Sequence, residues 1–417
     1  MIATLARPVT EASEVRRIRS IDGLRAVAVL AVMGYHFGVG PSGGFLGVDL
    51  FFVISGFVIT RLLLREDRIG WPVIRRFYAH RVRRLLPALL CVLVAVQLWV
   101  CLTDLPAMRT TVNSQTLATL GFSVNWYTIF ADVDYWSVQP DHTPLNHLWS
   151  LAVEEQFYLV WPALVVLIVA RYRRPRTLVI IACVGAISSY MMAAWHYSPG
   201  LPDRAYLGTD ARAGSLFLGA LSACAAGAFL PRLQKSQAAT KYTLPILAAL
   251  SSCVLLVLWT HSAINSPALY LWQLPLAGLS AAVLIFVLAI LDDHHRRNDF
   301  HPLSRLVLLI PTARPVVSVG AISYGLYLWH WPLWVYFNHT YPQLHPATLQ
   351  GAAFVASFVL ASLSFLLVES PARRCRIRNL LFSVASVSAV ITAFILVSAP
   401  VSQDGPTEEG PVVSGAR

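Results

Sequence analysis

The chain has 417 residues, of which 56% are hydrophobic and 13% are charged. A soluble domain usually carries about 25% charged residues, so this composition excludes an ordinary soluble protein and indicates a membrane protein. The net charge of +11 does not indicate nucleic-acid binding, because the basic residues fall in short clusters between apolar segments. The six cysteines form no metal-spaced pair, and we interpret them as small hydrophobic residues.

Apolar segments long enough to cross a bilayer as helices recur along the whole chain. They lie near 21–40, 45–64, 85–103, 145–170, 177–195, 213–230, 243–260, 272–291, 316–337, 348–368 and 380–399. A further segment, 303–313, is too short to span and contains Pro311, which favours an interfacial or re-entrant segment. The sequence therefore predicts an all-α integral membrane protein, a polytopic bundle of about 10–11 transmembrane helices.

Basic residues gather on one side of the predicted spans, and this asymmetry sets the orientation. The predicted exterior segments hold only Arg109, Arg204, Arg212 and Arg417. The positive-inside rule then places the N-terminus in the cytoplasm and the C-terminus outside, in the plasma membrane. The predicted organisation is a cytoplasmic segment, 1–20, a transmembrane domain, 21–399, and a short exterior tail, 400–417.

Two predicted exterior loops are rich in polar and aromatic residues. The longer, 104–144, contains Trp126, Tyr127, Tyr135, Trp136 and several carboxylates, and the shorter, 196–212, mixes proline, glycine and charged residues. Such surfaces suit sugar recognition, although aromatic residues also form ordinary membrane-interface belts. We interpret the loops as candidates for binding a sugar-containing acceptor.

The first apolar segment carries the basic residues Arg25 and His36. Eleven residues on a helix correspond to about 1100°, so both side chains leave nearly the same face, roughly 16 Å apart along the axis. Ionisable residues at membrane depth are costly and indicate a functional site. The alternative is an arginine that reaches the interface from a helix end, together with a hydrogen-bonded histidine inside the bundle.

Five motifs in order make the chain resemble the membrane-bound acyltransferase family 3. They are Asp22-Gly23-Leu24-Arg25 with Tyr35-His36-Phe37, then the stretches 43–57, 77–87, 147–158 and 323–332, with Glu369-Ser370-Pro371 closing the domain. Together they cover roughly 18–375. In the third motif His80 stands where the family usually has a second arginine before Arg81, but the spacing from Arg81 to Arg84 is intact.

This resemblance implies an enzyme that moves an acyl group, usually acetyl, from cytoplasmic acyl-CoA to a hydroxyl of a sugar. It implies no permanently bound cofactor and no nucleic-acid partner; the partners are acyl-CoA, the acceptor and the lipid bilayer. The acceptor can be a surface polysaccharide, an envelope glycolipid such as lipopolysaccharide, or a glycosylated metabolite such as a macrolide, and the sequence does not choose among them.

The predicted chemistry assigns a role to each motif. His36 is the general base or acyl relay, since a histidine needs only a modest pKa shift to take a hydroxyl proton near neutral pH. Arg81 and Arg84 are candidates for the donor phosphates, because guanidinium groups bind phosphate bidentately, although such clusters also simply set topology. Arg25 either binds the donor or pairs with Asp22 or Glu155.

Carboxylates supply the remaining candidate catalytic residues. Glu154 or Glu155 orients His36 or anchors an arginine, and Asp49 is another candidate to orient His36. The residues predicted to contact substrate in the later motifs are Ser150, Tyr158, Tyr324 and His330, with packing as the alternative for the last two. A nucleophilic role for Ser55 is disfavoured, because no base lies at a defined spacing.

One function of another class remains to be compared with acyl transfer. A transporter or lipid flippase would use the same intramembrane charges as a translocation path and predicts inverted hydropathy repeats, which the two halves do not show. No zinc-binding pattern is present, because His294 and His295 lie in a charged loop and are interpreted as solvated. The sequence therefore predicts no metal site.

Overall fold

The computed structural model describes residues 18–65, 70–103, 106–131, 143–172, 175–233, 236, 238–295 and 301–398. Within these ranges the chain is helical, and its only β-type pairing is an isolated bridge between Ser198 and Leu201. The predicted all-α class is thereby confirmed. The N-terminal segment before residue 18 and the tail after residue 398 lie outside the described residues.

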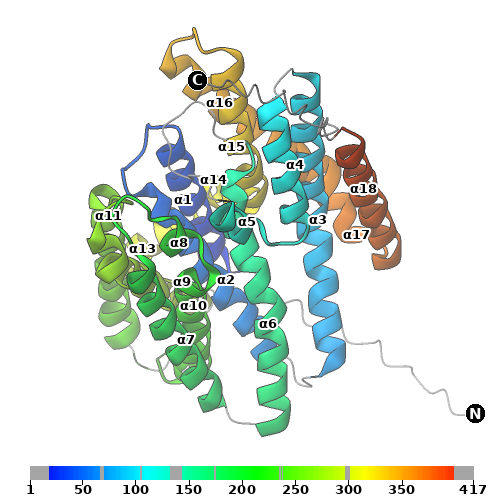
Figure 1. Ribbon diagram of the computed structural model, residues 1–417. Coiled ribbons are helices and arrows are strands. Elements are labelled where there is room, and N and C mark those ends of the chain that lie inside the picture. The colour runs from blue at the N-terminus through cyan, green and yellow to red at the C-terminus, as the bar shows by residue number, and fades with distance from the viewer. Residues whose placement is uncertain are drawn as a thin grey trace, which may run out of the picture.

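The helices run through the bundle in the following order (Figure 1). The first half contains α1 (Arg19–His36), η1 (Gly44–Leu46), α2 (Gly47–Leu64), α3 (Trp71–Leu102), α4 (Pro106–Leu120), α5 (Val124–Phe130), η2 (Asn146–Leu148), α6 (Trp149–Tyr172), α7 (Pro175–His196), α8 (Asp203–Leu207), α9 (Thr209–Arg212) and α10 (Gly214–Leu233). The second half contains η3 (Ala239–Thr243), α11 (Leu244–His261), η4 (Leu269–Gln273), α12 (Leu274–His295), α13 (Pro302–Thr312), α14 (Arg314–Ala321), α15 (Ser323–Thr340), α16 (Pro346–Ser364), η5 (Phe365–Glu369), α17 (Ser370–Arg374) and α18 (Ile377–Ser398).

Each of the eleven predicted spans corresponds to a helix, but fewer helices qualify as spans. Among the described residues, seven are long and apolar enough to cross a membrane, or up to eight if the bent pair α13–α14 is one span. Helix α1 falls short because it carries Arg19, Asp22 and Arg25 in eighteen residues. The apolar parts of α10 and α18 are shorter than a full span. The charged residues that α1 contributes to the bundle thus make this helix less apolar than a lipid-facing helix.

The segment around Pro311 is a break between two helices. Helices α13 and α14 meet at an angle of 43°, which fits either a broken span or a re-entrant loop. The break packs closely on α1: a Cβ on Gly23 would come within 2.0 Å of the Pro311 carbonyl oxygen, and one on Gly320 within 1.8 Å of the Asp22 carbonyl oxygen. Glycine at both positions therefore lets the backbones touch beside Arg25.

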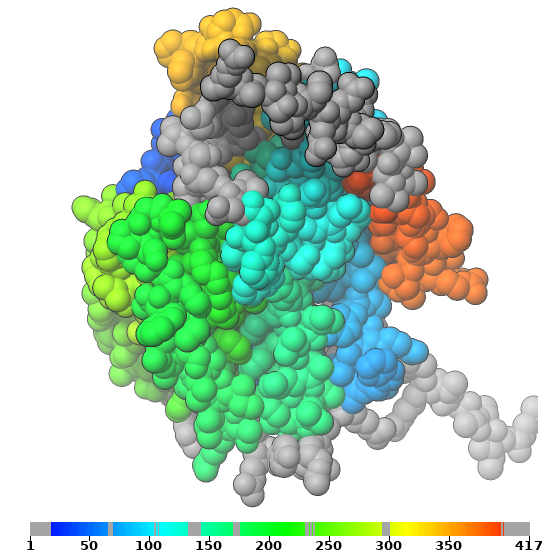
Figure 2. Space-filling model, in the orientation of Figure 1, coloured from blue at the N-terminus to red at the C-terminus, as the bar shows by residue number. Residues whose placement is uncertain are grey.

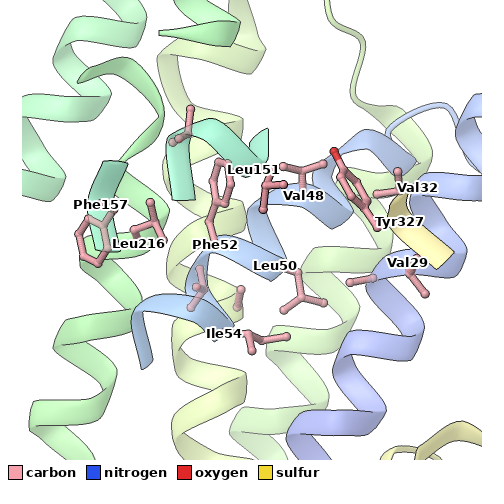
Figure 3. Close-up of a cluster of buried hydrophobic side chains, with 14 of the residues drawn as sticks. Val29, Val32, Val48, Leu50, Phe52, Ile54, Leu151, Phe157, Leu216 and Tyr327 are labelled. Atoms are coloured by element: carbon pink, nitrogen blue, oxygen red, sulfur yellow. The ribbon is translucent and has the colours of Figure 1, made fainter. Parts of the chain in front are cut away.

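The apolar core lies between α1, α2, α6, α10 and α15. Figure 3 shows side chains from these five helices meeting, among them Val29 of α1, Phe52 of α2, Leu151 of α6, Leu216 of α10 and Tyr327 of α15. All of them are buried. Burying such side chains fixes how the polar residues on the same helices face one another.

Helices α2 and α10 approach each other through glycines. A Cβ on Gly56 would lie 1.9 Å from the Leu216 carbonyl oxygen, and one on Gly219 would lie 2.1 Å from the Val53 carbonyl oxygen. Such distances leave no room for a methyl group. Small residues at helix crossings allow this close packing in membrane proteins.

We expect Gly219→Ala to destabilise the protein by about 1–3 kcal/mol, because the added methyl forces α2 and α10 apart. The matched control is Gly227→Ala on the same helix, where a Cβ would meet nothing within 4 Å. This control should gain about 0.5–1 kcal/mol, since alanine favours a helix interior over glycine. Thermal unfolding of both purified variants in detergent measures the difference; equal unfolding temperatures would contradict the close contact.

The two predicted exterior loops are more ordered than expected. The stretch 104–144 contains helices α4 and α5, and 196–212 contains the short helices α8 and α9. The described parts of both loops therefore contain helices, and polar contacts join the α5 region to α6. Gln156 of α6, for example, bonds the Phe122 carbonyl and the side chain of Asn125. Tyr135, Trp136 and the carboxylates between 132 and 142 lie outside the described residues.

Candidate active site

A cavity of about 90 Å³ lies between five helices of the bundle. It is lined from α1 by Arg25, from α2 by Val48, Phe51, Phe52 and Ser55, from α3 by Arg81, Arg84 and Leu85, from α6 by Ser150, Leu151, Glu154 and Tyr158, and from α15 by Ser323, Tyr324 and Tyr327. We call it the arginine cavity. The cavity brings together six predicted substrate-binding residues that are far apart in sequence.

The three arginines of the cavity differ in what they contact. Arg81 binds both oxygens of Glu155, at 2.6–3.0 Å, and its guanidinium lies 3.1 Å from the centre of the Tyr158 ring. Arg25 bonds Asp22 at 3.2 Å. For Arg84, no carboxylate lies within 4 Å among the described residues, and its side chain is exposed. Arg84 is therefore the cavity arginine most able to bind an added anion.

The two adjacent glutamates take different partners. Glu155 anchors Arg81, whereas Glu154 accepts a hydrogen bond from the Ser55 hydroxyl at 2.8 Å and lies 4.0 Å from Arg81. The sequence left two roles open for these glutamates, orienting His36 or anchoring an arginine. The ion pair between Glu155 and Arg81 is a direct contact of the second kind. Both carboxylates lie at the Arg81 end of the cavity.

His36 forms a histidine pair with His330 near the other end of α1. Its Nδ1 lies 2.8 Å from His330 Nε2, and the two rings are nearly parallel, with centres 5.1 Å apart. His330 is fully buried, and its Nδ1 lies 2.7 Å from the Tyr327 carbonyl oxygen and 3.2 Å from that of Leu326. His36 is only partly buried, so it is the accessible member of the pair.

These contacts determine the tautomer of both neutral rings. A carbonyl oxygen can only accept, so His330 Nδ1 carries a proton and donates it. His330 Nε2 is then the acceptor, and His36 Nδ1 must donate to it. The lone pair of His36 therefore sits on Nε2, where it can take a proton. This arrangement suits a general base whose other nitrogen is held by a buried partner.

Tyr327 connects the histidine pair to the arginine cavity. Its carbonyl oxygen accepts from His330, and the residue also lines the cavity. The Tyr327 hydroxyl donates to the His147 carbonyl oxygen at 2.7 Å and so accepts from the Ser150 hydroxyl at 2.6 Å. Tyr324, one turn earlier, bonds the Leu85 carbonyl oxygen at 3.0 Å.

Asp49 requires a correction. Its carboxylate binds Arg212 at 2.8 Å and the Ser215 hydroxyl at 3.0 Å, and the two ionic side chains are only 1–2% exposed. The sequence suggested that Asp49 orients His36 and that Arg212 lies in an exterior loop. Both oxygens of Asp49 are instead engaged by residues of α9 and α10, so the pair joins these helices to α2.

Tyr327 and His147 lie in the stretches 323–332 and 147–158, but no role was predicted for either residue. Tyr327 precedes His330 by three positions, so the two share a helix face, and this spacing could have indicated a joint function. His147 is 1% exposed, and its ring packs against those of Tyr327 and His330 at 5.4 and 5.5 Å. Because His147 lies in a short 3-10 turn, no helical spacing of this kind indicated a role for it. Within the described ranges, no three histidine, cysteine or acidic residues are grouped to hold a metal ion.

Comparison with known sequences gives one family. A family profile described as "Acyltransferase domain" matches residues 18–368. This range contains α1 to α16, the arginine cavity and the histidine pair.

Several relatives are similar over most of this chain. "Peptidoglycan O-acetyltransferase OatA" of Listeria monocytogenes is 33% identical over 368 residues, and "Putative peptidoglycan O-acetyltransferase YrhL" of Bacillus subtilis is 34% identical over 370. "O-acetyltransferase OatA" of Staphylococcus aureus is 33% identical over 362 residues. Each match covers 86% of this chain but only 55–58% of the relative, so the chain spans little more than half their length. No solved structure matches it.

Proposed function

The chain belongs to the family of this acyltransferase domain, and on that premise we propose that it transfers an acetyl group from acetyl-CoA to a hydroxyl of a sugar-containing acceptor. The observation that carries the proposal is the paired His36, whose lone pair sits on Nε2 and which Tyr327 connects to the arginine cavity. The family match does not favour the transporter alternative.

The donor enters from the arginine cavity. The phosphates of CoA are anions, which suit Arg84 and the neighbouring Arg81 and Arg25. The pantetheine arm then extends past Tyr158 and Tyr327 toward the histidine pair. By the positive-inside rule this end faces the cytoplasm, where acyl-CoA is found, in a plasma membrane with a cytoplasmic N-terminus and an exterior C-terminus.

The transfer step needs one proton acceptor. The acceptor hydroxyl oxygen attacks the thioester carbonyl carbon while His36 Nε2 takes the hydroxyl proton. The carbon–sulfur bond breaks, and the imidazolium returns its proton to the departing CoA sulfur. The products are an acetyl ester and free CoA. During the step, His330 holds the Nδ1–H of the cationic ring, as a second residue orients the histidine in other acyl-transfer sites.

The acceptor is proposed to be a cell-surface glycan. The relatives named as peptidoglycan O-acetyltransferases favour peptidoglycan, while an envelope glycolipid or a glycosylated metabolite is the alternative. Mass spectrometry of glycan, lipid and secreted fractions tests this directly, comparing wild-type cells with cells producing His36→Ala. One species should lose the mass of an acetyl group; unchanged spectra in every fraction would contradict the proposal.

We expect Arg84→Gln to raise the KM for acetyl-CoA by about 10- to 100-fold, because a charge-assisted hydrogen bond to phosphate contributes roughly 1.5–3 kcal/mol. The effect should disappear with S-acetylpantetheine, which lacks the nucleotide phosphates. Arg75→Gln, an exposed arginine of the same helix that does not line the cavity, is the matched control. An equal rise in KM for acetyl-CoA and for S-acetylpantetheine would show that Arg84 does not bind the nucleotide.

A further inference from the structure

Helix α4 buries a polar face, whereas a surface helix of a soluble protein turns its apolar stripe inward. Among the described side chains of α4, the buried ones are Val112, Asn113, Gln115, Thr116 and Thr119. Four of these five are uncharged polar residues. Its opposite face forms part of the molecular surface (Figure 2), where Leu117 is 39% exposed.

Several polar atoms on this buried face have no hydrogen-bond partner within the described part of the chain. They are Asn113 Oδ1, Gln115 Oε1, Thr119 Oγ1, Gln97 Oε1 of the adjoining α3, and both ring nitrogens of His147. The His147 ring lies beside the Leu328 backbone and the rings of His330 and His36, but among the described residues it makes no hydrogen bond of normal geometry. Buried polar groups in native proteins are nearly always paired, so a cluster of exceptions calls for a missing partner.

The cluster adjoins the histidine pair. Gln115 donates to Asn146 Oδ1 at 2.7 Å, and Asn146 directly precedes His147 in the chain. The His147 ring meets the His330 ring edge to face at 5.5 Å. Trp331, whose ring centre lies 4.8 Å from that of His36, donates to the Thr143 carbonyl oxygen at 3.0 Å. Gln115 of the polar face of α4 is therefore connected through Asn146 and His147 to the histidine pair.

We propose that the polar face of α4, with Gln97 and His147, binds the sugar ring of the acceptor. This inference rests on the proposed function and assigns its second substrate. Uncharged amides, hydroxyls and imidazole match the hydroxyl and acetamido groups of an amino sugar, whereas the charged residues of the arginine cavity match the donor phosphates. Because the atoms are buried, acceptor entry requires α4 to shift toward its exposed side.

Two substitutions test the proposal without removing any hydrogen bond between described residues. Within that part of the chain, the hydroxyl that Thr119→Val deletes has no partner, and neither has the amide oxygen that Asn113→Leu replaces. Replacing unpaired buried groups with apolar ones of similar shape is structurally neutral or stabilising. Acetyl transfer is measured with acetyl-CoA and a soluble peptidoglycan glycan strand. We expect the KM for the glycan to rise at least about tenfold, with unchanged Kd for acetyl-CoA and an equal or higher Tm.

Thr110→Val, on the exposed face of α4, is the control and should leave the KM for both substrates unchanged. A glycan KM within about twofold of wild type in both variants would overturn the inference and leave ordered water as the missing partner. The inference would also be overturned if the affinity for acetyl-CoA fell as much as the affinity for the glycan, or if both variants failed to fold. Either result would indicate that these residues have a structural role. A wild-type protein that acetylates no glycan would contradict the proposed function itself.

Discussion

Replacing His36 with alanine is expected to lower kcat for acetyl transfer by roughly 10²- to 10⁴-fold, the range that a general base contributes. The Kd for acetyl-CoA should stay within about twofold, because His36 does not line the arginine cavity. Steady-state kinetics of protein reconstituted in liposomes, together with donor binding, measures both. The control is His261→Ala, which replaces an exposed histidine at the end of α11 and should retain full activity. Transfer at the wild-type rate would exclude His36 as base or relay.

Variants of His330 distinguish this mechanism from one in which His36 acts as a base without a partner. His330→Leu removes the acceptor for His36 Nδ1–H, so we expect kcat to fall although the base is present. His330→Gln keeps an oxygen acceptor near the position of Nε2 and should recover part of the loss and shift the pH profile of kcat. Because the two rings act as a unit, the double variant with His36→Ala should be no slower than His36→Ala alone. Additive losses would mean that His330 acts independently of His36.

The sequence predicted the helices well because their signals are local. Apolar length located a helix for every predicted span, and Pro311 marked the break between α13 and α14. The number of true spans was harder to predict. Helix α1 carries three charged residues, so its membrane role follows from packing on α2, α12 and α14 rather than from hydropathy.

The site could be predicted only where one helix carried several of its residues. Arg25 and His36 share a face of α1, and their spacing alone indicated a site with two ends. The partner of His36 could not be deduced, since His330 lies 294 residues away and meets it only through tertiary packing. Asp22 lies three residues before Arg25 on α1, but Glu155 could be dismissed as the partner of Arg25 only once the packing of α6 was known.

The polar face of α4 shows a different limit of sequence reasoning. A helix with Asn113, Gln115, Thr116 and Thr119 carries no strong apolar stripe, so it was expected to be part of an exterior loop. Hydropathy assumes that polar residues face water. It therefore fails for α4, whose polar residues are buried.

The buried ion pair between Asp49 and Arg212 should contribute strongly to the stability of the fold. We expect Asp49→Ala to destabilise the protein by about 3–5 kcal/mol, because it leaves a guanidinium buried without its counter-charge. A substitution of both residues, Asp49→Leu with Arg212→Met, should restore most of that stability, since apolar side chains of similar volume can replace a buried ion pair. Thermal unfolding in detergent measures all three proteins.

Activity of the double variant then decides between the two roles considered for Asp49. If the pair only joins α2 to α9 and α10, the restored fold brings back acetyl transfer, because His36 is oriented by His330. If Asp49 instead orients His36, the double variant is stable but inactive, since leucine accepts no hydrogen bond from an imidazole. Two hydrogen bonds already engage both oxygens of Asp49, one from Arg212 and one from Ser215. The buried position of both bonds favours a stable and active double variant.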